Sequence, residues 1–166
     1  MLKWKSLPIV TVDDDALYDD DLLQVLYNGY KEFPDNVIAR RTHLMKRDAT
    51  SNLLPYRQWK YECSEICLNP NKDLFATGVG GILYPADCLK IDDSLLPEIK
   101  KCLNADDVFL KKREQVLGID VVYVKGKRLL SYSNQQSSVA DYALCFKNNT
   151  TKRCDNDLYI SQIGLK

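Results

Sequence analysis

The sequence contains one histidine, no Cys-x-x-Cys pair and no long apolar run. The apolar stretch at residues 7–12 is too short to cross a membrane or to act as a signal peptide, and no other stretch approaches that length. We therefore expect a cytoplasmic protein. The chain also lacks any excess of charge, since its 23 basic and 23 acidic residues cancel, which excludes general electrostatic attraction to nucleic acid.

The cysteines give no sign of a disulfide framework. There are six, at positions 63, 67, 88, 102, 145 and 154, in a chain of 166 residues that is large enough to bury its own core as one domain. A zinc site at Cys63 and Cys67 is the alternative, but the sequence offers no second pair of ligands. We expect reduced, buried thiols.

Strand and helix signals alternate along the first half of the chain. Residues 7–13 are predicted to form a strand buried on both faces. Residues 20–33 are predicted to form a helix whose N-terminus Asp19, Asp20 and Asp21 can cap and charge. A second strand is predicted over residues 36–45, with the basic pair Arg40 and Arg41 at its far end. The irregular stretch at residues 46–73 is typical of a binding loop, in which Tyr56 and Trp59 would stack on a sugar or simply pack.

The second half continues this alternation. A glycine-rich segment at residues 77–81 leads towards a short helix near residues 86–89, and a longer helix over residues 105–117 ends at Gly118. A strand over residues 119–124 follows, and the last part of the chain is expected to hold one or two short helices. The pattern predicts one α/β domain with a mixed sheet and flanking helices, in which residues 131–166 form a C-terminal extension.

The most informative feature is the end of the first strand, where Asp13, Asp14 and Asp15 stand side by side. Adjacent carboxylates repel one another, so this arrangement favours a bound cation, and hard oxygen ligands suit Mg²⁺ or Mn²⁺. Asp13 and Asp15 could both reach such an ion. A calcium loop would need other residues at the positions of Leu17 and Tyr18, and an aspartyl phosphatase would need others at those of Ala16 and Leu17. An acidic turn ahead of a helix remains the alternative.

A second acidic pair, Asp106 and Asp107, lies at the predicted start of the 105–117 helix. Neighbouring residues on a helix point in different directions, so one carboxylate could cap the helix while the other faces a cleft. The glycines at positions 78, 80 and 81 would let backbone approach a ligand, or would simply form a tight turn. Together with the acidic strand end, these segments could line one cleft.

Four segments in this order resemble bacterial glycosyltransferases of the GT-A type, related to family two and to the enzymes that build lipopolysaccharide and capsule. They are LPIVTVDDDALY, PYRQW, FATGVGGILYP and CLNADDVFLK. The resemblance spans residues 7–124 and implies a central, largely parallel sheet. It also implies transfer of a sugar from a nucleotide-diphosphate donor to a saccharide or lipid-linked saccharide acceptor, with peripheral membrane association at the inner face.

The resemblance also assigns roles to residues. A Mn²⁺ or Mg²⁺ ion would be held by Asp13 and Asp15, and the donor would lie against Asp13, Asp14, Gly80 and Gly81. Asp107 would be the base that takes a proton from the acceptor hydroxyl, with Asp106 orienting it, in an inverting reaction.

The sequence departs from the family in one respect. There the acidic strand end follows a half that supplies the nucleotide-binding strands, whereas here it begins at residue 13. We therefore expect the DxD-and-acceptor half of a GT-A fold, with an apolar sheet edge that another chain or a second copy would cover. The alternative is a non-catalytic carbohydrate-binding or interaction remnant.

Overall fold

The structure, a computed structural model, describes residues 7–14, 16–126, 149–150 and 153–166. Within these residues the central sheet has four strands, ordered β1 (Ile9–Thr11), β5 (Ile82–Tyr84), β2 (Val37–Ala39) and β6 (Val121–Tyr123). β2 and β6 run parallel, whereas β5 is antiparallel to both β1 and β2. The fold is therefore mixed α/β with a mixed sheet, as predicted, but this sheet is not largely parallel.

The strands β2, β5 and β6 are apolar throughout because both faces of the sheet are covered. Successive side chains on a strand point to opposite faces. Ile38, Leu83 and Val122 pack on one side with Leu22 and Leu26. On the other side lies a second apolar cluster: Val37, Ala39, Cys63, Leu74, Ala76, Ile82, Tyr84, Cys88 and Val121.

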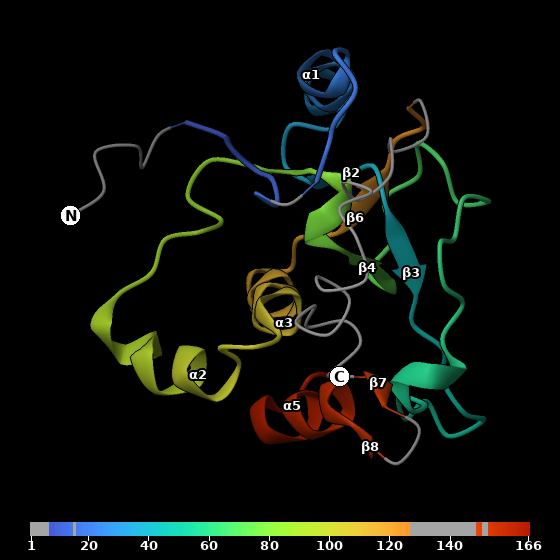
Figure 1. Cartoon of the computed structure of the whole chain (residues 1–166), viewed down its shortest axis with the longest axis vertical. Helices are drawn as coiled ribbons and strands as arrows, with labels where there is room; N and C mark the ends of the chain where they lie inside the picture. The colour runs from blue at the N-terminus through green and yellow to red at the C-terminus, as the bar shows by residue number, and fades with distance from the viewer. Residues whose placement is uncertain (1–6, 15, 127–148, 151–152) are drawn as a thin grey trace.

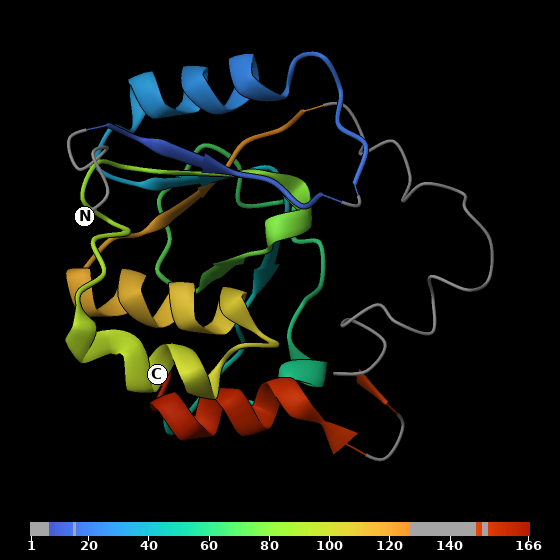
Figure 2. The same cartoon turned by 60° about the vertical axis from the view of Figure 1, so that its left-hand side comes forward.

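Helices cover the two faces as layers. Helix α1 (Leu22–Glu32) lies on one face of the sheet and α3 (Asp106–Leu117) on the other, with α2 (Leu96–Lys101) and α5 (Asp155–Ile163) beyond α3 (Figures 1 and 2). Gly29 allows α1 to sit close to the sheet, since a Cβ atom there would lie 2.8 Å from Ile38 Cγ2. The predicted helices at residues 20–33 and 105–117 are both present, and Gly118 ends α3 with φ +67°.

The strand predicted over residues 36–45 is interrupted. It divides into β2 and β3 (Thr42–Leu44), and β3 pairs with β4 (Leu74–Ala76) in a separate sheet. Arg40 and Arg41 lie at the break, where Arg40 turns towards the segment before α1. Near the C-terminus a short hairpin joins β7 (Asn149–Thr150) and β8 (Arg153–Cys154).

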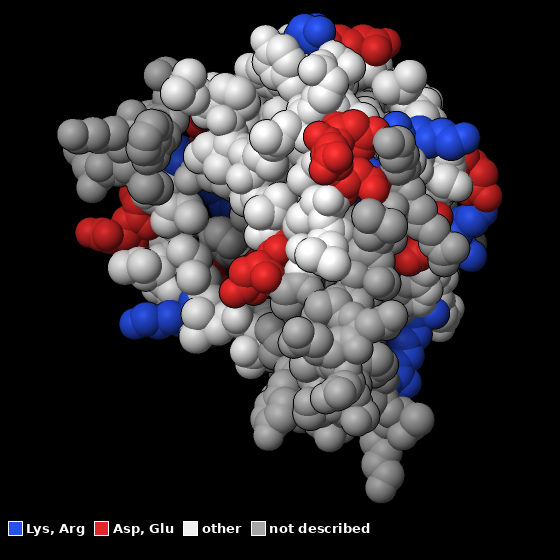
Figure 3. Space-filling view, turned by 45° about the horizontal axis from the view of Figure 1, so that its top comes forward, with Lys and Arg blue, Asp and Glu red and all other residues white. Residues whose placement is uncertain are grey.

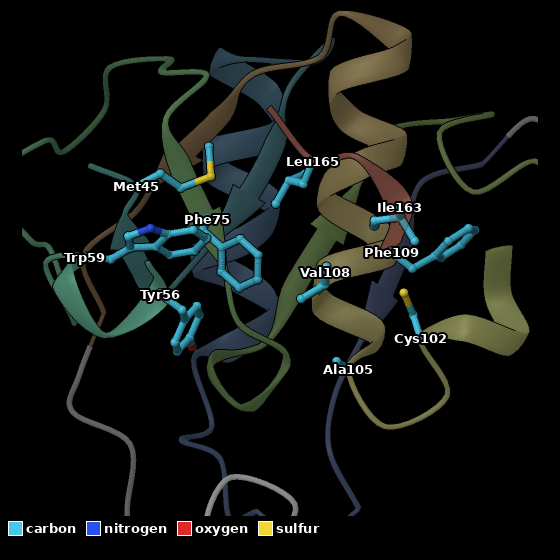
Figure 4. Close-up of a cluster of buried hydrophobic side chains, with 10 residues drawn as sticks. All are labelled: Met45, Tyr56, Trp59, Phe75, Cys102, Ala105, Val108, Phe109, Ile163 and Leu165. Carbon is cyan, nitrogen blue, oxygen red and sulfur yellow. The ribbon is translucent and has the colours of Figure 1, made fainter. Parts of the chain in front are cut away.

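The predicted binding loop at residues 46–73 contributes to the core instead of standing away from it. Tyr56, in a 3₁₀ turn (Tyr56–Gln58), and Trp59 are 6% and 3% exposed and pack around Phe75, so packing and not sugar stacking accounts for them (Figure 4). His43 also packs against Tyr56 and Phe75. From the C-terminal segment, Ile163 and Leu165 join the same core.

Two further expectations about elements are wrong, and one helix was not predicted. β1 is half-buried and not enclosed on both faces, because among the described residues it is an edge strand. Residues 86–89 form a turn and not a helix, and α2 is not among the predicted helices. The opposite edge is covered, since Cys67 and Asn71 bridge to β6. The open edge at β1 is flanked by the exposed side chains of Leu7 and Val12.

Two expectations about the chain as a whole can be compared with the structure. Cys63, Cys67, Cys88 and Cys102 are free thiols, and Cys63 and Cys67 do not share a helix. None of the helices in the described part of the chain has the length and apolarity that crossing a membrane requires.

Candidate active site

The register of the central sheet brings distant segments to one end of it. Thr11 of β1 and Ala39 of β2 both lie opposite Ile82, the first residue of β5. The residues that follow β1 and β2 therefore meet those that precede β5. These are Asp13, Arg41 and the glycine turn (Gly78–Gly80), which connects β4 to β5.

The carboxylates of Asp13 and Asp107 face the same point of the glycine turn. A Cβ atom built on Gly78 would lie 2.9 Å from Asp13 Oδ1 and 3.5 Å from Asp107 Oδ1. Gly78 N–H also donates a hydrogen bond to Asp107 Oδ1 over 3.0 Å. Glycine is needed here because a side chain would occupy the space that the two carboxylates share. Residues remote in sequence thus form one acidic site.

The environment of Asp107 favours its protonated form. Burial of the carboxyl group raises its pKa to about 8, and the nearby charges of Asp106 and Asp13 act in the same direction. The hydrogen bond from Gly78 and the charge of Arg41 oppose this shift. Although residue Asp107 keeps some solvent exposure, protein atoms enclose its carboxyl oxygens, so desolvation is the larger effect. A carboxyl group with a pKa near neutrality can exchange protons with a substrate.

The other predicted acidic residues lie around this pair in different ways. Asp106 is exposed on the first turn of α3, and neither it nor Asp107 caps the helix, because Ala105 occupies the N-cap position without a side-chain hydrogen bond. Asp14 is exposed. Asp15, the second predicted metal ligand, lies outside the described residues.

The three glycines of the segment differ in what they face. Gly78 faces the carboxylates, but a Cβ on Gly80 would lie 2.5 Å from Arg41 Cβ, and one on Gly81 would lie 2.8 Å from Leu22 Cδ1. Gly81 also has φ +78°. Gly80 and Gly81 were the predicted donor contacts. Protein atoms already occupy the space where their side chains would lie, so only their backbone could contact a ligand.

Hydrogen bonds and ion pairs hold the loop that carries Asp13. Asp13 N–H donates to Tyr18 Oη over 2.8 Å, and the buried Arg40 guanidinium contacts Asp19 Oδ2 over 3.2 Å and Asp21 Oδ1 over 4.0 Å. Asp19 and Asp21 therefore do not cap α1 as predicted. Asp21 is its N-cap residue, but its side chain makes no capping hydrogen bond. These carboxylates hold the loop against the sheet.

The donor set is compatible with a hard divalent cation but incomplete in the described residues. Within residues 7–14, 16–126, 149–150 and 153–166, no group of three His, Cys, Asp or Glu side chains is arranged to hold a metal ion. The chemistry still fits, because the carboxylates of Asp13 and Asp107 face one point and the negative charge of Asp13 helps to raise the pKa of Asp107. A cation bound there would relieve that repulsion.

Arg41 and Thr77 also belong to this site, although the sequence pattern does not predict their contact. Arg41 Nη1 donates to Thr77 Oγ1 over 2.9 Å, immediately before the glycine turn. In the sequence, Arg41 is only a basic residue at the predicted end of a strand. Its position was nevertheless a usable signal, because the ends of neighbouring strands gather the groups of a site.

The face of the molecule in Figure 3 has no dominant charge among its described residues. The face in Figure 3 carries separate acidic patches and scattered basic side chains among uncharged surface.

Comparison of the chain with protein-family models and with curated proteins finds no match. A function must therefore be inferred from the chemistry of the site itself.

Proposed function

We propose that this chain is the acceptor-side part of a GT-A-type glycosyltransferase, which transfers a sugar from a nucleotide-diphosphate donor to a saccharide acceptor. The observation that carries the proposal is the approach of Asp13 and Asp107 to the same point at Gly78. Such a reaction needs a base for the attacking hydroxyl and a cation for the leaving diphosphate, and these carboxylates match the two needs.

Asp107 is the proposed base. The acceptor oxygen forms a bond to the anomeric carbon, the bond from that carbon to the diphosphate oxygen breaks, and the hydroxyl proton passes to Asp107. A pKa of about 8 makes the ionised form of Asp107 a stronger base than an ordinary aspartate, and the fraction in that form increases as pH rises towards 8. Direct displacement of this kind inverts the configuration at the anomeric carbon.

Asp13 is the proposed metal ligand, together with Asp15. A bound Mn²⁺ or Mg²⁺ would neutralise charge on the departing diphosphate. Arg40 supports this part of the site by holding the loop after Asp13 through Asp19. Gly78 places no side chain between the two carboxylates.

Two variants separate the two roles. Asp13→Asn should weaken binding of Mn²⁺, measured by electron paramagnetic resonance, and should slow turnover of any active donor in a panel of nucleotide sugars. Asp107→Asn should abolish turnover, since the amide cannot accept the proton, and should weaken Mn²⁺ binding less than Asp13→Asn does. Asp20→Asn is the matched control, because Asp20 is an exposed aspartate of the same loop.

The results that would overturn the proposal are equally specific. Mn²⁺ affinity unchanged by Asp13→Asn, with no nucleotide sugar consumed, would exclude a metal-assisted transferase. Binding of an oligosaccharide under those conditions would favour the carbohydrate-binding remnant.

A further inference from the structure

Arg41 links three segments that lie far apart in the sequence. Its Nη1 atom donates to Thr77 Oγ1 over 2.9 Å, and its carbonyl oxygen accepts from Thr77 N–H over 3.2 Å. Its Nε and Nη2 atoms both lie 3.2 Å from Glu62 Oε1. The guanidinium therefore ties Glu62, in the 46–73 segment, to Thr77, the residue that precedes the glycine turn.

Glu62 is itself held in an unusual conformation. Its φ of +49° lies in the left-handed region, which is strained for a residue other than glycine. Its N–H donates to His43 Nδ1 over 3.1 Å. His43 accepts this bond because burial, aided by the charge of Arg41, lowers its pKa to about 4 and keeps the ring neutral. The surrounding structure thus holds Glu62 where its carboxylate meets Arg41.

The far side of Arg41 fits closely against the glycine turn. A Cβ on Gly80 would lie 2.8 Å from Arg41 N and 2.5 Å from Arg41 Cβ, so the turn lies directly on this residue. Thr77, which Arg41 holds, is 4% exposed and immediately precedes Gly78. A shift of Thr77 would therefore move the Gly78 N–H that contacts Asp107.

We infer that Arg41 is a positioning residue, which sets the place of the glycine turn and so the hydrogen bond from Gly78 to Asp107. Its effect on catalysis rests on the function proposed above, whereas its effect on the turn does not. The planar, branched shape of the guanidinium matters as well as its charge. One nitrogen donates a hydrogen bond to Thr77, and the other two contact the carboxylate of Glu62. Lysine cannot reproduce this geometry.

The first test follows the Gly78 amide by NMR hydrogen exchange in the full chain. Arg41→Gln should speed exchange of this amide by about tenfold, as expected when a supported hydrogen bond is weakened. Arg41→Lys should give a smaller change of the same kind. Arg47→Gln is the matched control, because Arg47 also pairs with a carboxylate, Asp73, and its side chain has the same 26% exposure as that of Arg41.

Thr77 gives a second route to the same contact. Thr77→Val removes the oxygen that Arg41 binds and preserves the volume, so it should reproduce the effect of Arg41→Gln on Gly78. Thr77→Ser keeps the hydroxyl and should restore the wild-type exchange rate. This pair decides the question even if the Arg41 variants do not fold.

Turnover of the nucleotide-sugar panel supplies the catalytic readout. Arg41→Gln and Thr77→Val should lower kcat by roughly 10- to 100-fold, as expected for displaced catalytic groups, with little change in KM. If the Gly78 amide responds equally to Arg41→Gln and Arg47→Gln, or not at all, the inference fails. If that amide responds as expected but the wild-type chain consumes no donor, the positioning role holds and the proposed function fails.

Discussion

Gly78 and Asp107 are joined by a 3.0 Å hydrogen bond from the backbone N–H to Oδ1, which connects the turn after β4 to the first turn of α3. The bond provides one favourable contact to a carboxyl group that burial and two neighbouring aspartates otherwise keep protonated. It also places the Cα atom of Gly78 against Asp13. Changes at Gly78 and Asp107 therefore test the site most directly.

Replacing Gly78 by alanine should damage the site more than the fold. The new Cβ would lie 2.9 Å from Asp13 Oδ1, too close for a real contact, so the Asp13 side chain must move. Gly78 has no positive φ, and alanine should therefore cause little backbone strain. We expect weaker Mn²⁺ binding and loss of turnover, with a free energy of unfolding, measured by urea denaturation, within about 1 kcal/mol of the wild-type value.

Gly118→Ala is the control for that change. Gly118 has φ +67° and open space around its Cβ position, so alanine should cost about 1 kcal/mol of backbone strain. It lies at the far end of α3 from Asp107 and should leave Mn²⁺ binding unchanged. Equal effects of the two substitutions on Mn²⁺ binding would contradict the role assigned to Gly78.

Asp107 should make the protein less stable as pH rises. Its pKa is raised from 3.8 to about 8 in the folded chain, so between these values the folded state binds more protons than the unfolded state. The free energy of unfolding contributed by this group is then highest below pH 4 and decreases, by on the order of 3–5 kcal/mol, as pH rises through 8.

Asp107→Asn removes this titration and tests the prediction. Denaturation of both proteins at pH 5 and pH 9 should show a larger loss of stability in the wild type than in the variant. Glu114, whose pKa burial also raises, is present in both proteins and cancels in the difference. A difference that is the same at the two pH values would show that Asp107 titrates normally.

The elements that the sequence predicted well are those with local signals. The apolar spacing of α1 and the left-handed Gly118 at the end of α3 can be recognised from neighbouring residues alone. The break between β2 and β3 could not be predicted, because residues on both sides of it favour strands. At this break Arg40 contacts Asp19, 21 positions away. Local propensity carries no information about such a pair.

The candidate site shows the same division. Acidic residues at a strand end and at a helix start were visible in the sequence, and the structure brings Asp13 and Asp107 together. The contacts of Arg41 were not visible, since its partners Glu62 and Thr77 are 21 and 36 residues away. Their identity depends on how β3 and β4 pair. The chemical types of the site could thus be predicted, but not the residues that position them.

His43 should make the protein less stable in acid. Its pKa is lowered from 6.5 to about 4, so between these values the unfolded state binds more protons than the folded state. Its contribution to the free energy of unfolding is complete above pH 6.5 and is lost, by about 3 kcal/mol, as pH decreases through 4. His43→Gln removes this titration.

The measurement for His43 needs a background in which Asp107 does not titrate, because that group acts in the opposite direction over the same range. Urea denaturation of Asp107→Asn, with and without His43→Gln, at pH 7 and pH 4.5 isolates the histidine. The chain that retains His43 should lose more stability on acidification. An equal loss in both chains would mean that His43 does not titrate as described.

Arg40 should be among the most costly residues to replace. Its side chain is 2% exposed and pairs with Asp19, whose side chain is 8% exposed, at 3.2 Å. Arg40→Met would leave that carboxylate buried without the guanidinium and should cost about 3–5 kcal/mol. Since Asp19 anchors the loop after Asp13, Mn²⁺ binding should weaken as well. Both effects can be followed in the same samples, by urea denaturation and by titration with Mn²⁺.

Arg47→Met provides the comparison. Its ion pair with Asp73 is shorter, 2.7 Å, but the two side chains are 26% and 25% exposed, so solvent screens the interaction and the expected cost is about 0–1 kcal/mol. Burial, not distance, should therefore determine the difference between the two arginines. If Arg40→Met and Arg47→Met lower the free energy of unfolding equally, the contact of Arg40 with Asp19 does not hold the loop that carries Asp13. In that case Mn²⁺ binding should survive both substitutions.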